Sequence, residues 1–567
     1  MQSDRAPVII ASPRKGVGPL ETDPRLWRPG PTVMLRFQVF LNGHPATAWP
    51  IRNAYLLGAD GNPVRSEIRF ASGAICCENR EGGNAALVLQ QNTGGCGVIS
   101  LQTCLLPDRD EPYLLNVELA RHRLLVLYHK LEDWAMFDLG PSHPVTKRTG
   151  SARKRFIEAI CWQQEHPARS DKLGRESLVA ALNASEELAL AHADLLLQRR
   201  MATGAMPRRM VGCGLTMSQP QERIRSSLLA TFDYVILPIP WQQLAPEEGE
   251  YRWDMLDQWA QWLQQRQMPV VGGPLVSFQP GMVPDWLFIW EHDFGTVRDL
   301  MYEHIEQVVA RYRQLVTEWI VVSGLHVNNH PSFSFDQIIE LTRMSGLLVR
   351  DLQPEAKVWV QISHPFGEYY SHNQQSIPPL TYADLLVQSQ VPFDGFNIKL
   401  FMGQPAAGQH TRDLLQVSNL LDQFAQMGKP ICLTVAVPSE PVPASRRKTV
   451  SQDTSGHWRK PWSQVVQARW LTAVLRIALS KPFTQSVAWG QMVDHPDSEL
   501  PASGLIDQRL EPKGAYRRLV AYRRLLTAPP VIRPDAEMPD SASSAPRVRQ
   551  NPDSDPPPPT GSQGQGG

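Results

Sequence analysis

The sequence predicts an α/β protein with a (β/α)8 barrel at residues 205–528, preceded by an antiparallel β-sandwich at 33–140 and a helical connector at 150–203. In the barrel region, eight strand-like runs alternate with helical patterns over roughly 320 residues, which is the length such a barrel needs. In the sandwich region, short β-like runs are separated by Gly, Asp and Asn clusters. Between the two regions, the apolar period becomes helical.

The predicted sandwich begins with residues 33–41, which partly alternate and are followed by the tight-turn pair Asn42-Gly43. Apolar runs that we interpret as further strands lie at 54–57, 86–89, 97–101, 113–119 and 124–128. In the connector, residues 177–182 and 187–197 carry helix formers with an apolar stripe. This region therefore joins or braces the two domains.

The barrel prediction depends on apolar runs that are each followed by a helical pattern or a polar loop. The eight predicted strands are 210–215, 234–237, 270–275, 319–322, 357–362, 395–400, 430–435 and 487–490. Residues 1–32 are rich in Pro, Gly and charge, and residues 529–567 lose all periodicity. We expect a flexible leader and a disordered tail there.

The charge balance excludes general binders of nucleic acid or anionic membrane, since 56 Lys and Arg match 56 Asp and Glu in 567 residues. The seven cysteines show neither a C-x-x-C pair nor a zinc spacing, so we expect buried thiols, with no metal site and no cofactor. The N-terminus lacks the pattern of a secretory signal. We therefore expect a cytoplasmic protein.

Three stretches of the barrel region carry a family likeness. They are Pro246-Glu247 through Trp253, then Val283-Pro284-Asp285-Trp286, and finally Trp489-Gly490 through Gly504-Leu505-Ile506-Asp507 to Pro512-Lys513. In this order and spacing they resemble glycoside hydrolase family 10, the xylanase-like family. The resemblance implies a barrel and a retaining glycosidase ancestry, with polysaccharide or oligosaccharide as the partner. A sandwich before such a barrel is similar in architecture alone to a carbohydrate-binding module.

The resemblance also locates two catalytic positions, and neither holds a carboxylate here. Retaining glycosidases use two carboxyl groups about 5–5.5 Å apart. The family's acid/base Glu follows a fourth-strand segment whose Trp and Val residues match here, but Gly324 stands at its position. The nucleophile follows a seventh-strand Thr that matches Thr434, but Val435 stands at its position. We therefore expect the usual double-displacement chemistry to be absent, and the catalytic residues are unknown.

Polar residues beyond other strand ends offer a remodelled site as one interpretation and loop capping as the other. The candidates are His326, His364, Glu368 and Asp494, in which a carboxyl group would act as acid or base beside an imidazole. The candidate platforms for sugar rings are Trp241, Trp286 and Trp489. Two functions stay open: a family 10-like protein of xylan-type carbohydrate metabolism or binding, and a non-catalytic scaffold that binds another protein.

Overall fold

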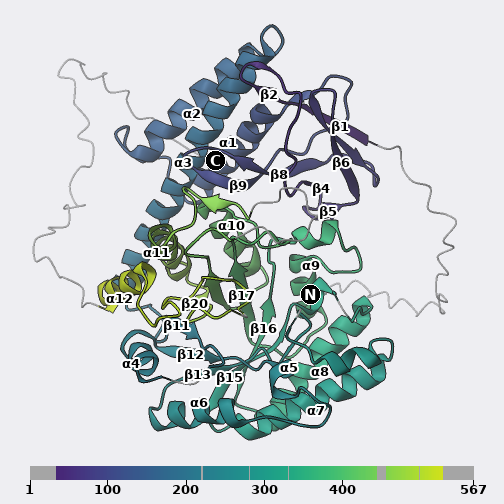
Figure 1. Ribbon diagram of the computed structural model, residues 1–567. Coiled ribbons are helices and arrows are strands. Elements are labelled where there is room, and N and C mark those ends of the chain that lie inside the picture. The colour runs from purple at the N-terminus through teal and green to yellow at the C-terminus, as the bar shows by residue number, and fades with distance from the viewer. Residues whose placement is uncertain are drawn as a thin grey trace, which may run out of the picture. The chain divides into compact units, whose positions relative to one another are not determined.

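A closed parallel barrel forms the C-terminal part of the computed structural model, which describes residues 33–218, 221–279, 281–329, 331–442, 455–496 and 498–527 (Figure 1). The predicted leader and tail lie outside the described residues. The barrel strands are β11 (Val211–Gly214), β12 (Tyr234–Leu237), β13 (Val270–Gly272), β15 (Val316–Ser323), β16 (Lys357–Ile362), β17 (Gly395–Phe401), β18 (Ile431–Ala436) and β20 (Thr484–Trp489). They pair in parallel, and the β13–β15 pairing closes the ring. The prediction of a (β/α)8 barrel with these eight strands is confirmed.

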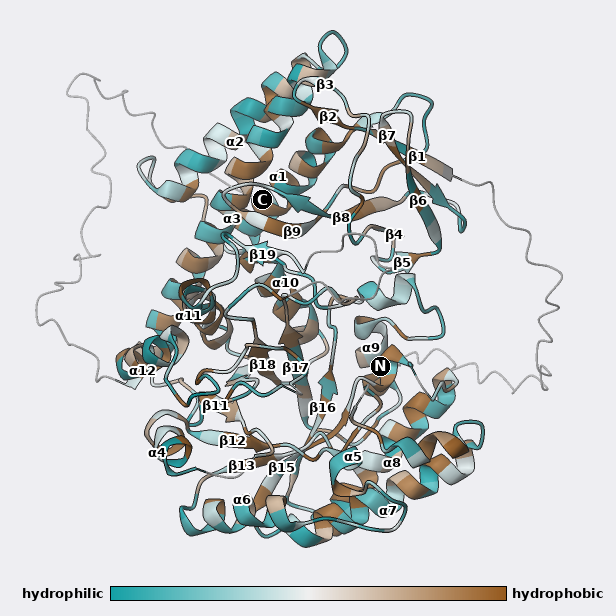
Figure 2. Cartoon of the chain, viewed as in Figure 1, coloured by the Kyte–Doolittle hydropathy of each residue, from teal (hydrophilic) through white to brown (hydrophobic). Residues whose placement is uncertain are grey.

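Helices surround the barrel and connect its strands. They are α4 (Glu222–Thr231), α5 (Trp241–Leu244), α6 (Asp254–Gln265), α7 (Phe294–Tyr312), α8 (Phe335–Leu352), α9 (Pro379–Gln388), α10 (Leu414–Ala425), α11 (Gln464–Ser480) and α12 (Gly514–Thr527). The short strand β14 (Val276–Ser277) and the 3-10 helices η1 (Asp285–Trp290), η2 (Leu325–Val327) and η3 (Glu368–Ser371) lie in connections. Capping boxes fix the starts of α8 and α10, with Ser334 and Asp413 as the caps. In Figure 2, which colours the cartoon by residue hydropathy, hydrophobic segments are frequent in the barrel strands, and the surrounding helices alternate hydrophobic and hydrophilic residues.

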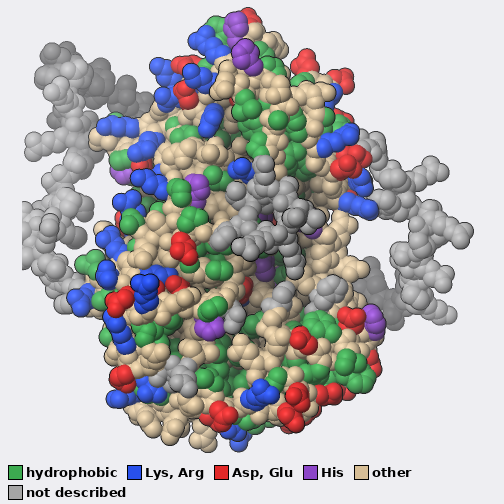
Figure 3. All heavy atoms as spheres, viewed as in Figure 1, with side chains coloured by type: hydrophobic (Ala, Val, Ile, Leu, Met, Phe, Trp, Pro, Cys, Tyr) green, Lys and Arg blue, Asp and Glu red, His purple; other side chains and the backbone are tan. Residues whose placement is uncertain are grey.

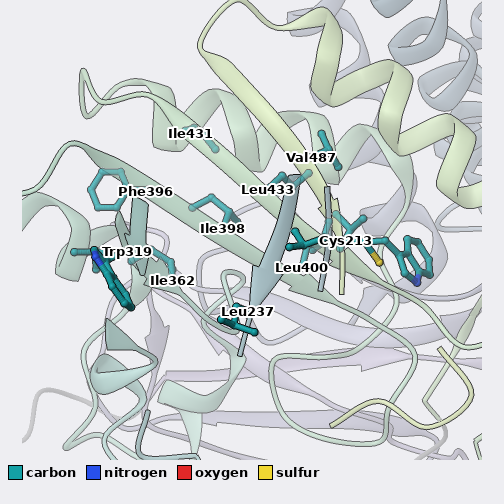
Figure 4. Close-up of a cluster of buried hydrophobic side chains, with 14 of the residues drawn as sticks. Cys213, Leu237, Trp319, Ile362, Phe396, Ile398, Leu400, Ile431, Leu433 and Val487 are labelled. Carbon is teal, nitrogen blue, oxygen red and sulfur yellow. The ribbon is translucent and has the colours of Figure 1, made fainter. Parts of the chain in front are cut away.

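The strands alternate their side chains between two environments. One set packs outward against the helices, as Leu237, Ile398, Leu400 and Leu433 do in Figure 4. The other set points into the barrel, where Tyr234, Ile236, Trp359 and four others form a separate buried cluster. Because side chains of a strand alternate with period two, knowing the outward residues fixes which residues face the interior.

The N-terminal region contains two main sheets. One has the order β10-β1-β7-β6, and the other has the order β19-β9-β8-β4-β5, in which β19 is the short segment His457–Trp458. Their pairings are antiparallel except for β1 with β10, and residues of both sheets share one apolar core. The strands are β1 (Val33–Gln38), β2 (Phe40–Leu41), β3 (His44–Pro45), β4 (Tyr55–Leu57), β5 (Pro63–Val64), β6 (Ser66–Ala71), β7 (Ala74–Asn79), β8 (Ala86–Asn92), β9 (Gly97–Gln102) and β10 (Tyr113–Leu114).

Two predicted strands in this region are wrong. Residues 124–128, and most of 113–119, belong to the helix α1 (Leu115–Asp133). Leu115, Leu119, Leu127 and Leu131 are buried, and this spacing by multiples of four places them on one helical face. The sequence separates these leucines into short apolar runs, which explains why strands were predicted. The strands of the predicted 33–140 sandwich therefore end at Leu114.

Two further helices lie between the sheets and the barrel along the chain, in the region of the predicted connector 150–203. They are α2 (Pro144–Cys161) and α3 (Pro167–Ala202), which has 36 residues. The helix α3 packs against α1 and α2 at one end and against α10 and α11 of the barrel at the other. Asp194 of α3 forms an ion pair with Arg476 of α11. This long helix is therefore packed against both regions.

Loops after β17 and β18 fasten the sheets to the C-terminal end of the barrel. The short strand β19 (His457–Trp458) follows β18 and pairs antiparallel with β9. Arg123 of α1 forms a buried ion pair with Asp413, with Nη2 and Oδ2 2.5 Å apart. Glu186 of α3 accepts a hydrogen bond from Trp458 Nε1 at 2.6 Å and pairs with Arg459. The sheets therefore lie over the end of the barrel where ligands bind in this fold.

Candidate functional site

A cavity of about 210 Å³ opens at the C-terminal ends of the barrel strands. Its residues come from all eight barrel strands or the loops that follow them. The lining residues with polar or aromatic side chains are Thr216, Gln243, Gln361, Lys399, Phe401, Thr434, Gln491, His495, Ser498 and Glu499. We call it the mouth cavity. Its position is where barrel enzymes place their active sites.

One ion pair dominates the charge of the mouth cavity. Lys399 is an interior residue of β17, and its ammonium pairs with the carboxylate of Glu499 from the loop after β20. Lys399 Nζ also donates to Gln279 Oε1 at 3.3 Å, and Gln409 Nε2 donates to Glu499 Oε1 at 3.3 Å. The side chain of Glu499 is 35% exposed, so the pair remains open to a ligand. Among the described lining residues, Glu499 is the single carboxylate.

A chain of hydrogen bonds crosses the barrel interior beneath this pair. Ser323 Oγ donates to Gln361 Oε1 at 2.6 Å, and Gln361 Nε2 donates to Asn397 Oδ1 at 2.9 Å. Thr434 Oγ1 donates to the same Asn397 oxygen at 3.0 Å. The chain joins β15 to β18, and buried polar groups connected in this way hold fixed rotamers. It supplies a rigid polar floor.

Gly324 lies at the end of β15 and has a left-handed backbone with φ +67°. A Cβ atom at this position would lie 2.5 Å from Ser363 Oγ. Both the backbone and the space therefore favour glycine here. The backbone at this position is unsuited to a glutamate side chain.

Val435 lies in β18 with its side chain fully buried on the outer side of the barrel. Its neighbours in register, Leu400 and Trp489, belong to the same outer core. The preceding Thr434 faces the interior and lines the mouth cavity. Position 435 consequently points towards the helices, away from the cavity.

Glu368 is held in a buried charge cluster that also contains residues of the N-terminal sheets. Its Oε2 accepts from His410 Nδ1 at 2.6 Å and from the Gly408 amide at 2.8 Å, and its Oε1 pairs with Arg412. Arg412 also donates to the Tyr55 hydroxyl at 3.2 Å. Burial alone would raise the pKa of Glu368, but Arg412 and His410 outweigh it and hold the pKa at about 2. A carboxylate held ionised in this way does not serve as a proton donor near neutral pH.

The two candidate histidines are both neutral near pH 7. Burial lowers the pKa of His326 to about 3, and its ring stacks on Tyr382 while Nε2 lies 2.9 Å from the Ser363 carbonyl oxygen. Burial lowers the pKa of His364 to about 4. His364 reaches the mouth indirectly, since its Nε2 lies 3.4 Å from Gln409 Nε2.

Asp494 is bound within the loop after β20. Its Oδ2 lies 2.5 Å from Lys513 Nζ, and its Oδ1 accepts from the Gly504 amide at 2.7 Å. These two partners indicate that the carboxylate of Asp494 holds the loop in place. The structure therefore does not bring His326, His364, Glu368 and Asp494 together around one cavity, and none of the four lines the mouth cavity.

The three candidate tryptophan platforms also lie outside the mouth lining. Trp241 is 2% exposed and stacks on His304, and Trp489 is 1% exposed and packs in the outer core. Trp286 is partly buried and donates through Nε1 to the Ala245 carbonyl at 2.8 Å. Because Trp241 and Trp489 are buried, neither ring has a free face on which a sugar could stack. The prediction that they are sugar platforms is therefore wrong, and both rings pack in the protein interior.

Sequence reasoning missed Gln361, Asn397 and Glu499. For Gln361 and Asn397 a signal was present, because each is polar at an interior position of a strand whose alternate residues are apolar. No such periodicity marks Glu499, which lies in a loop. Within the described residues, no group of three or more His, Cys, Asp or Glu side chains is placed to hold a metal ion. None of the described helices has the length and apolar character that a bilayer crossing requires.

Comparison with known proteins adds a family to this geometry. Residues 211–339, from β11 into α8, match the family model described as Glycosyl hydrolase family 10. The barrel resembles glycosyl hydrolase family 10. The matched segment contains two of the three motif stretches, and the third, at 489–513, lies beyond it.

Similar proteins are xylanases or carry the family 10 name. The endo-1,4-beta-xylanase A of Xylanibacter ruminicola is 25% identical over 197 residues, or 33% of this chain, which spans about half the length of that enzyme (50%). A solved family 10 structure from Paenibacillus barcinonensis is 17% identical with a TM-score of 0.43, covering 57% of this chain and 97% of its own. Xylanase 10B from Thermotoga petrophila RKU-1, solved with xylobiose, is 15% identical with a TM-score of 0.41, covering 57% and 97%.

Proposed function

We propose that this protein has a family 10-like barrel that binds a xylan-type saccharide at the mouth cavity. We further propose that it does not hydrolyse the saccharide by the retaining, double-displacement mechanism. The observation that carries the proposal is the charge of the cavity: its one described carboxylate, Glu499, is paired with Lys399. Retaining hydrolysis needs a second carboxyl group across the sugar. Gly324 and Val435 supply none, and the side chain of Val435 points away from the cavity.

Binding is supported by the chemistry of the lining. Lys399, Glu499 and Gln361 present donors and acceptors suited to hydroxyl groups, while Phe401 offers an apolar ring. The Lys399–Glu499 pair is neutral overall, which favours an uncharged sugar. The cavity is smaller than the roughly 300–1,000 Å³ of usual ligand pockets, so it suits one sugar unit or a chain end.

A scaffold role is the second candidate, and one observation favours it. The polar groups of the mouth engage one another, as Lys399 does with Glu499 and Gln361 does with Asn397. In that case the mouth is a structural network, and a protein partner binds elsewhere. Saccharide binding separates the two functions.

The test is calorimetric titration of the full chain with xylobiose and xylotriose. Lys399→Met should weaken binding by roughly tenfold, since it removes the charged donor at the cavity. Lys357→Met is the matched control, because Lys357 begins β16 at the opposite end of the barrel. Absence of binding by the unaltered chain, or equal loss in both variants, would favour the scaffold.

Hydrolysis is tested separately by reducing-sugar release from xylan. We expect no turnover above the uncatalysed rate from the unaltered protein. Turnover at ordinary glycosidase rates that disappears in Glu499→Gln contradicts the non-hydrolytic part of the proposal, and identifies Glu499 as a catalytic carboxylate.

A further inference from the structure

A second cavity system lies in the N-terminal region, far along the chain from the mouth residues. Two cavities of about 670 Å³ and about 580 Å³ share Phe40, Gly43 and Ala168. The shared residues make the two cavities neighbours, and we call the pair of cavities the hairpin groove. Its lining residues come from the β2–β3 hairpin and its flanks and from the start of α3, and the end of β8 contributes to the larger cavity.

We propose that the hairpin groove binds an acidic saccharide, a chain of sugars that carries carboxylate groups. This inference rests on the proposed function for its choice of saccharide, but it concerns a different site. Four features of the groove support it: its unpaired donors, its aromatic surfaces, its charge and its size.

The donors come from amide and guanidinium groups in the larger cavity. Gln91 Nε2 and Arg52 Nε are buried, and neither has a hydrogen-bond partner within the described part of the chain. Asn42, Asn92 and Asn116 also line this cavity. Buried donors without protein partners are costly unless a ligand or water satisfies them. Sugar hydroxyl and ring oxygens are acceptors of the required kind.

The aromatic surfaces are Trp49 and Phe40, which are both partly buried and both line the groove. Trp49 packs against the apolar core of the sheets, which fixes the orientation of its ring. A fixed and partly exposed ring offers an apolar face for the C–H face of a sugar ring.

The charge of the groove is positive. Arg52, Lys172 and Arg175 line the larger cavity, against the single carboxylate of Asp171. That carboxylate is already engaged, because Asn116 donates to it from its side chain at 2.9 Å and from its backbone amide at 3.4 Å. In the smaller cavity Arg169 accompanies Glu165. Four basic side chains against two acidic ones favour a ligand with carboxylates over a neutral one.

The groove also suits a chain in its size. Each of its two cavities has further lining residues beyond the three shared ones, and each is larger than the mouth cavity. A linear oligosaccharide has room for several contacts there. Together with the donors, rings and cations, this size points to an acidic oligosaccharide.

The test compares two probes of equal length, a neutral xylo-oligosaccharide and one that bears glucuronate side groups, by calorimetry with the full chain. The acidic probe should bind roughly tenfold more tightly than the neutral one, and this advantage should shrink as salt is raised. The double variant Lys172→Ala/Arg175→Ala should remove the advantage. Both side chains are exposed, so the fold should be kept.

The matched control is Arg153→Ala/Lys154→Ala, which removes two exposed cations from α2 outside the groove lining and should leave affinity unchanged. Gln91→Leu should weaken both probes, because it removes an unpaired donor. The proposal is overturned if the acidic probe does not bind, if the two probes bind equally, or if the groove variant binds as the control does. Lys399→Met separates the sites: if it has no effect on neutral saccharides while the groove variant still loses the acidic preference, the mouth proposal fails and the groove proposal stands.

Discussion

Two glutamates at the same end of the barrel, Glu368 and Glu499, show how differently one side chain can be used. Glu368 is 3% exposed and accepts hydrogen bonds from His410, Arg412 and a backbone amide. Glu499 has a third of its side chain exposed and pairs with Lys399 at the cavity rim. The first fixes the junction between sheets and barrel, and the second is open to a ligand. Burial and the number of partners distinguish a structural carboxylate from an available one.

The comparison is tested most strongly by Glu368→Gln. This change leaves Arg412 and His410 without their carboxylate in a buried site, which should cost about 3–5 kcal/mol of unfolding free energy. Denaturant unfolding, followed by fluorescence, measures the loss. A loss below about 1 kcal/mol is what an ordinary surface ion pair contributes, and it would contradict a structural role for Glu368 that differs from the role of Glu499.

The pH dependence of stability extends the test without mutation. The pKa values of His326 and His364 are lowered to about 3 and 4, so in the folded state these residues stay neutral while the unfolded chain takes up protons. Stability is therefore fully present above pH about 6.5 and falls below it, by about 1.4 kcal/mol per pH unit for each such histidine. Glu368, with a pKa of about 2, adds a loss that begins near pH 4.5. In Glu368→Gln, the loss of stability that begins near pH 4.5 should disappear. The loss caused by the two histidines below pH about 6.5 should remain.

The strand end at Gly324 gives a smaller effect. Gly324→Ala forces a left-handed backbone on alanine and places its Cβ against Ser363 Oγ, at a cost of about 1–2 kcal/mol. When Ser363→Ala is added, the variant should regain the part of its stability that was lost to the contact between Cβ and Ser363 Oγ. Thermal unfolding measures this gain. Full stability of Gly324→Ala alone would show that the strand end tolerates a side chain.

Glu499→Gln should have the smallest effect on stability, at most about 1 kcal/mol, because its pair is partly exposed. Its effect should instead appear in binding of neutral saccharide at the mouth. If Glu499→Gln destabilises the fold as much as Glu368→Gln does, both carboxylates are structural.

The sequence predicted the barrel better than it predicted the site. Period-two and helical patterns result from local geometry, so strands such as Lys357–Ile362 were identified with their observed bounds. The helix Leu115–Asp133 was missed because its leucines are grouped in short runs. The site depends on which loop residues meet in space, and no local pattern indicates that Glu368 lies beside Arg412 or that Glu499 reaches Lys399. Trp241 and Trp489 were misjudged because a position near a predicted strand end does not reveal whether the ring is buried.

The strand β19 has a consequence for biosynthesis. Residues 457–458 complete the edge of a sheet whose other strands lie between residues 55 and 102, so that sheet stays unfinished until most of the chain has left the ribosome. Until then, the backbone of Gly97 and Val98 at the edge of β9 lacks its partner strand, and an unpaired strand edge is a place where other chains can pair. Pairing over such a sequence separation is slow to form. Completion of this sheet edge therefore has to wait for synthesis of the barrel strands that precede β19.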